Sequence, residues 1–403
     1  MASLVTDAGT LNTACPMPQA RSTATKLDFD AMASRIIGAL KLNEGERVLI
    51  RFDPGYFYEL VGPLRRRIRE AGAVDVGALE YIDSAAVRDR ARPAVLTNIP
   101  SPQNEGRIRS QFEARARAFE QLLEAVDVYL WLPIRDDVRE IPFAERAALA
   151  RWLDKGGARR EIHFHWSGGS VLADGLAGPH STALDAVYQN ALDIDYAALS
   201  SAQDRAISLL RSGTARVRTP AGTDLSFRVG DRPFNKQNGD ASVERMKTAR
   251  VRVDREIELP AGVIRVAPLE ETATGRIVIP SARFGGKTAR NVRLEIQNGR
   301  VTRIEADENL NVVEKTLAEG GEAAHRFREF GLGFNAKLHS PPGSPSLAYY
   351  GYGAGVVRMS LGDNEELGGS VRGGFVRWFF FPDATVEVDG RVLVRDGKLA
   401  DVR

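Results

Sequence analysis

The strongest constraint on the fold is a change of pattern near Ser212. Before it, apolar runs of strand length alternate with segments of helical spacing: residues 47–52 precede residues 56–71, and residues 126–132 precede residues 142–153. Beyond it, short strands follow one another. The pairs Asn298-Gly299 and Asp389-Gly390 each lie between two such strands, as in a tight hairpin. Alternating strands and helices predict a parallel sheet, and successive hairpins predict an antiparallel one.

The sequence therefore predicts three parts. Residues 1–26, rich in Ser, Thr and Ala, are expected to form a flexible arm. Residues 27–211 are expected to form an α/β domain with a mostly parallel sheet, and residues 212–403 an α+β, largely antiparallel, barrel-like domain. With 403 residues, the chain is long enough for two hydrophobic cores.

Charge and composition narrow the function. The net charge of +2 gives no reason to expect nucleic acid or an anionic membrane as a partner. No apolar run is long enough to span a bilayer, and the first residues lack the pattern of a secretory signal. The only cysteine, Cys15, excludes an internal disulfide. A cytoplasmic protein is expected.

Several segments carry a specific resemblance. They are GERVLIRFDP (45–54), GTDLSFRVGDRP (222–233), LPAGVIRVAPLEET (259–272), REFGLGFN (328–335), VVRMSLGDN (356–364), FVRWFF (375–380) and EVDGRVLVRDGK (387–398). In order and spacing they resemble the aminopeptidase T and aminopeptidase S family. That resemblance implies the same fold, a homodimer, and a C-terminal domain that binds two divalent metal ions through two Glu, two His, an Asp and a Tyr.

The ligand positions of that family are mostly changed in this chain. The corresponding residues are Val263, Glu329, Arg358, Glu365, Arg377 and Phe379. Only Glu329 matches the family's ligand. An arginine is protonated at any physiological pH and would repel a cation. No metal and no other cofactor is therefore expected.

The two arginines suggest a replacement for the metal charge. Buried carboxylates are costly without a partner, so Arg358 and Arg377 are expected to neutralise Glu329 and Glu365 in one ion-pair cluster. Glu329 and Glu365 are the candidate acid–base residues. Arg358, Arg377, Trp378 and Tyr352 are the candidate ligand-binding residues.

Each of these residues also has a structural reading. The arginines could form salt bridges without a ligand, and Trp378 could serve only packing. Tyr352 lies in a glycine-rich segment that reads as a sheet bend or a mobile loop. Asp363 and Glu366 are expected in an acidic surface loop.

His163 and His165 lie two residues apart on a predicted strand, so their side chains share a face. Such a pair can bind zinc if an acid lies near, but a structural role is the favoured prediction.

Three functions stay open. The favoured one is a divergent member of the family that binds or transforms a small molecule or a peptide end without metals. The second is an active metallo-aminopeptidase with new ligands, such as His325 or His339 beside Glu329 and Glu365. The third is a non-catalytic partner protein.

Iron-dependent ring-cleaving dioxygenases share the fold. They hold iron with a His and an Asp around the same Trp, where this chain has Arg377 and Phe379. The sequence therefore resembles them no better, and an iron role is also disfavoured.

Overall fold

The structure is a computed structural model that describes residues 27–52, 54–80, 102–132, 143–164, 170–176, 178 and 182–401. The arm predicted over residues 1–26 lies outside the described residues, as do Cys15 and His165.

The first sheet is parallel throughout, with the strand order β2-β1-β3-β4-β8. Its strands are β1 (Arg47–Phe52), β2 (Val74–Glu80), β3 (Val128–Leu132), β4 (Arg160–Phe164) and β8 (Glu256–Leu259). The predicted parallel sheet is confirmed. Its fifth strand comes from beyond Ser212, so a boundary at that residue does not separate the two halves cleanly.

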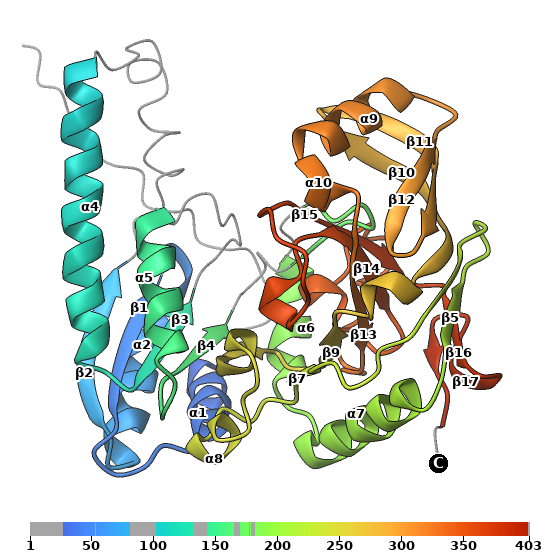
Figure 1. The fold of residues 1–403 in the computed structure, drawn as a ribbon. Helices are drawn as coiled ribbons and strands as arrows, with labels where there is room; N and C mark the ends of the chain where they lie inside the picture. The colour runs from blue at the N-terminus through green and yellow to red at the C-terminus, as the bar shows by residue number, and fades with distance from the viewer. Residues whose placement is uncertain are drawn as a thin grey trace, which may run out of the picture.

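Helices cover both faces of this sheet (Figure 1). One face packs on α1 (Phe29–Leu40) and α2 (Pro54–Glu70), through side chains such as Ile36 and Leu64 against Ile50. The other packs on α4 (Pro102–Glu124) and α5 (Phe143–Asp154), where Leu123 and Trp152 share a small core with strand residues. Burial on both faces explains why β3 and the middle of β1, residues 48–50, are continuous apolar runs.

The second half of the chain forms two antiparallel sheets. The larger has the order β12-β11-β10-β6-β5-β16-β17-β18. Its strands are β5 (Ala215–Arg218), β6 (Asp224–Phe227), β10 (Thr274–Phe284), β11 (Lys287–Gln297), β12 (Arg300–Glu305), β16 (Thr385–Val388), β17 (Arg391–Arg395) and β18 (Lys398–Leu399). The smaller has the order β15-β14-β13-β9-β7. Its strands are β7 (Asn235–Gln237), β9 (Val263–Val266), β13 (Phe327–Gly333), β14 (Val357–Gly362) and β15 (Val376–Phe381).

Both predicted hairpins are present in the larger sheet. Gln297 pairs with Arg300, so Asn298 and Gly299 alone make the turn, with φ of 50° and 72°. Asp389 and Gly390 make the corresponding turn between β16 and β17, with φ of 46° and 83°. Positive φ at both positions is the geometry that favours Asn-Gly and Asp-Gly.

The remaining helices join and cover the sheets. They are α6 (Thr182–Ala191), α7 (Tyr196–Arg211), α8 (Val243–Met246), α9 (Leu310–Glu319) and α10 (Gly321–Ala324), with 3-10 helices η1 (Arg252–Arg255), η2 (Glu270–Thr272), η3 (Tyr349–Gly351) and η4 (Glu365–Leu367). One hydrophobic core runs continuously from α1 and the parallel sheet into the antiparallel sheets. Among the described residues, no helix is long and apolar enough to cross a membrane.

Candidate functional site: a buried guanidinium–carboxylate cluster

One face of the smaller antiparallel sheet gathers charged side chains. Arg265 on β9 and Arg358 on β14 lie either side of Gly331 on β13. On the same face of β13, two residues before Gly331, Glu329 pairs with Ser360, and Ser360 pairs with Trp378 on β15. A Cβ at Gly331 would lie 3.4 Å from the Arg358 Nε atom, so the glycine leaves room for the guanidinium groups.

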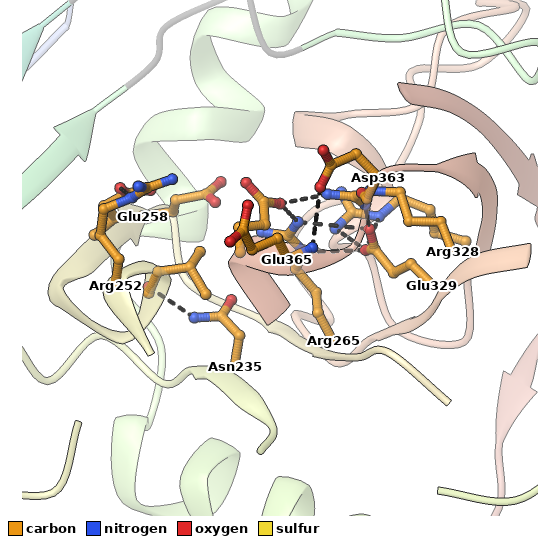
Figure 2. A network of polar contacts seen from close by, with 12 residues as sticks. Asn235, Arg252, Glu258, Arg265, Arg328, Glu329, Asp363 and Glu365 are labelled. Atoms are coloured by element: carbon orange, nitrogen blue, oxygen red, sulfur yellow. Dashed lines mark hydrogen bonds and ion pairs between the residues drawn. The ribbon is translucent and has the colours of Figure 1, made fainter. Parts of the chain in front are cut away.

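Glu329 lies at the centre of this face and is fully buried. Arg265 donates from Nε to its Oε1 at 3.0 Å, and Arg358 donates to the same oxygen at 2.6 Å and 2.9 Å. Arg328 donates to Oε2. Three guanidinium groups therefore surround one carboxylate, as Figure 2 shows for Arg265 and Arg328. We call these four residues with Glu366 the guanidinium cluster.

A β-bulge brings Arg328 into the cluster. Phe327 pairs with Leu361 and Glu329 with Ser360, so Arg328 is an extra residue without a partner on β14. A bulge re-aims a side chain that regular alternation would send to the other face. Arg328 and Glu329 can therefore contact each other although they are consecutive.

Glu366 completes the cluster from η4. Its Oε1 accepts from Arg265 at 2.7 Å and also from Arg328. Burial opposes its ionisation, but Arg328 and Arg265 outweigh that effect and lower the pKa of Glu366 to about 2. The side chain is 33% exposed, so this permanent carboxylate reaches the edge of the cluster.

A tyrosine and a tryptophan enclose Arg358. Its guanidinium carbon lies 5.8 Å from the ring centre of Tyr352 and 5.4 Å from that of Trp378. Tyr352 donates to Glu258 on β8 at 2.6 Å. Burial and the charge of Arg265 lower the pKa of Arg358 to about 10, so it stays charged at neutral pH. Tyr352 is buried, so its role in the structure is to hold Arg358 rather than to face an open cavity.

Arg377 does not join the cluster, contrary to the prediction. It pairs with Leu361, whereas its neighbour Trp378 pairs with Ser360, so alternation sends Arg377 to the opposite face. There it lies over the rings of Phe284 and Phe379 and donates to the Arg283 carbonyl oxygen at 2.9 Å.

Glu365 also lies outside the cluster. It forms an ion pair with Arg372 at 2.8 Å, and its side chain is 55% exposed. Its neighbour Glu366, expected in a surface loop, lies in the cluster where Glu365 was predicted. The predicted ion pair between Glu329 and Arg358 is thus present. The prediction that Glu365 and Arg377 join the same cluster is wrong.

Sequence reasoning missed Arg265 and Arg328. Arg265 follows Val263 by two residues on β9, so alternation from that ligand position could have placed it on the same face. No such signal was available for Arg328, because the bulge is visible only in the paired strands.

The donor set does not fit a dinuclear metal centre. Val263 is buried and apolar, and the one retained carboxylate is already bound by three guanidinium groups. In the described part of the chain, no group of three or more His, Cys, Asp or Glu could hold a metal ion. His325 and His339, the alternative ligands, therefore belong to no such group. His163 instead pairs with Glu161 at 2.7 Å.

A cleft of about 610 Å³ opens beside the cluster. Its charged lining comes from Arg146 and Asp154 on α5, Arg252 on η1, and Arg328, Asp363, Glu365 and Glu366. The cleft therefore lies between a helix of the parallel-sheet region and the strands that carry the cluster. Arg328 and Glu366 belong both to the cluster and to the lining of the cleft.

The fold is that of two solved enzyme structures. A 2,5-dihydroxypyridine dioxygenase from Pseudomonas putida KT2440 aligns with a TM-score of 0.59 and 14% identity, over 93% of this chain and 97% of that one. Wild-type AmpT from Thermus thermophilus aligns with a TM-score of 0.58 and 17% identity, over 92% and 99%. A comparison with curated proteins found no match.

The chain belongs to the NicX family, described as 2,5-dihydroxypyridine 5,6-dioxygenase, whose model matches residues 196–401. The resemblance to the aminopeptidases is thus confirmed for the fold. The expectation that the chain resembles the dioxygenases no better than the aminopeptidases is wrong, because the family model that matches is that of a dioxygenase.

Proposed function

We propose that this protein binds a small hydroxylated N-heteroaromatic molecule in the cleft, with the guanidinium cluster in place of a metal centre. The observation that carries the proposal is Glu329, whose two oxygens are occupied by Arg265, Arg328 and Arg358. Those contacts leave the carboxylate no capacity for a cation, and fixed guanidinium charge would repel one.

The class of ligand follows from two features. The family description names 2,5-dihydroxypyridine, a planar ring with polar edges. The cleft presents arginines and carboxylates, which can donate to and accept from such edges. A peptide end, the other ligand suggested by the sequence, would bind to the same arginines and carboxylates of the cleft. We also propose a homodimer, as the aminopeptidase resemblance implies.

The family match favours a second candidate, a working ring-cleaving dioxygenase. It would require a metal held by residues other than those of the guanidinium cluster.

One set of measurements separates these functions. The protein is purified without chelator, its metal content is measured by mass spectrometry, and binding of 2,5-dihydroxypyridine is followed by calorimetry. Ring cleavage after addition of Fe²⁺ and release of aminoacyl anilides after addition of Co²⁺ or Zn²⁺ are assayed in parallel. We expect binding without stoichiometric metal and without turnover in either assay. Metal-dependent ring cleavage or peptidase turnover would contradict the proposal.

A further inference from the structure

Four ionisable side chains lie together on one face of the parallel sheet, next to the cleft. Glu161 and His163 on β4 pair in register with Glu256 and Glu258 on β8. Side chains two residues apart on a strand share a face, so the four form a block. The residues between them, Ile162 and Ile257, lie in the core on the opposite face. We call the four residues the β4–β8 block.

Glu256 is the member of the block that lies against a residue of the cleft lining. Arg252, which lines the cleft, approaches its Oε1 at 3.5 Å. Glu366, which also lines the cleft, acts on it electrostatically. The Glu256 side chain is 24% exposed, whereas Glu161 behind it is buried. Figure 2 shows Arg252 and Glu258 beside the residues of the guanidinium cluster.

The groups around Glu256 act on its pKa in opposite directions. Burial raises its pKa to about 7; Glu161 and Glu366 act in the same direction, while His163 and Arg252 oppose them. Burial disfavours the charged form of His163, but Glu161 outweighs that effect and raises the pKa of the imidazole to about 9. His163 is therefore a cation at neutral pH. Glu366, with a pKa of about 2, stays a carboxylate.

We propose that Glu256 exchanges a proton with the hydroxyl group of the ligand bound in the cleft, and that the His163–Glu161 pair is the positioning group behind it. This inference rests on the proposed function. The ligand O–H bond breaks, its electron pair stays on the ligand oxygen, and the proton forms an O–H bond on the Glu256 carboxylate. Once Glu256 is neutral, the charge of Arg252 is available to the ligand anion.

The test uses the ultraviolet spectrum of bound 2,5-dihydroxypyridine, because the neutral ring and its anion absorb differently. The pH is chosen so that the free compound is neutral and Glu256 is mostly ionised. We expect wild-type protein to hold the anion. Because wild type keeps the proton on Glu256, calorimetry in buffers of different ionisation enthalpy should show that the anion forms without release of a proton. In Glu256→Gln the amide cannot accept the proton, so any anion held by Arg252 should form only with release of one proton to the buffer. The matched control Glu244→Gln, at a side chain that is 78% exposed on α8, should behave as wild type.

A second variant covers the case in which Glu256→Gln does not fold. His163→Asn removes the cation that opposes protonation of Glu256, so the midpoint of the spectral change should move to higher pH. Release of one proton to the buffer as wild type forms the anion would overturn this inference and leave the proposed function intact. An unmoved midpoint in His163→Asn would do the same. Absence of any binding by wild type would overturn the proposed function and this inference with it.

Discussion

At the scale of single residues, the cluster shows how a buried carboxylate is compensated. The charge of Glu329 is balanced by Arg265, Arg328 and Arg358. Removing a buried ion from water is expensive, and the contacts must be close for the attraction to offset that cost. Arg358 meets this condition through two hydrogen bonds to one oxygen.

Arg358→Met should therefore destabilise the fold, because Glu329 loses two charge-assisted hydrogen bonds while remaining buried. The expected loss is about 3 kcal/mol, the lower end for breaking a buried pair, since Arg265 and Arg328 remain. Urea unfolding followed by circular dichroism measures it. Arg303→Met, at a side chain that is 71% exposed, should change stability by no more than about 0.5 kcal/mol. Equal losses in the two variants would show that the cluster carries no special electrostatic weight.

The pH dependence of stability is a second prediction at this scale. Burial and Glu161 raise the pKa of Glu256 from 4.5 to about 7, so between these values the folded protein binds more protons than the unfolded chain. Its contribution to stability is present below pH 4.5 and is lost as the pH rises through about 7. Glu256→Gln should remove that decline, so the variant gains on wild type over this interval. Unfolding midpoints measured across the interval, with Glu244→Gln as control, test the sign; parallel curves for wild type and Glu256→Gln would refute it.

At the scale of the elements, strand alternation decides which charges meet. Arg377 and Trp378 are consecutive on regular β15, so they point to opposite faces, and only Trp378 reaches Arg358. Arg328 and Glu329 are also consecutive, but the bulge on β13 brings them together. The same residue spacing thus gives opposite outcomes, depending on the pairing of the strand.

The two hairpin turns give a matched prediction for an element. Gly299 has φ of 72°, and a Cβ there would lie 2.0 Å from the Glu270 carbonyl oxygen. Gly390 has a similar φ of 83° but open space around it. Gly390→Ala should cost about 1 kcal/mol from backbone strain, and Gly299→Ala clearly more, because η2 must also move. Thermal unfolding of the two variants compares them directly; equal costs would mean that the contact with η2 is unimportant.

At the scale of the whole molecule, β8 ties the two halves of the chain together. It lies beyond Ser212 in the sequence but completes the parallel sheet beside β4. Its residue Glu258 accepts from Tyr352, whose ring lies against Arg358 in the antiparallel half. The cleft lies where these halves meet, so its shape depends on this link.

Tyr352→Phe removes the hydrogen bond that joins Glu258 to the antiparallel half. Because a partly buried carboxylate loses a donor, we expect a loss of about 1–3 kcal/mol in unfolding free energy. Tyr58→Phe is the control, since Tyr58 is 69% exposed on α2. Urea unfolding monitored by tryptophan fluorescence gives the comparison. A Tyr352→Phe variant as stable as the control would show that this bond does not hold the halves together.

The sequence by itself determined the order of the sheets and the two hairpins, because these depend on local spacing and residue chemistry. It also predicted the pairing of Glu329 with Arg358, since both stood at positions of one site. Only the tertiary structure decided that Arg265, Arg328 and Glu366 join that pair while Arg377 and Glu365 do not. The physical reason is that strand register, a bulge and the placement of β8 depend on pairings between distant segments, which residue spacing along the chain does not encode.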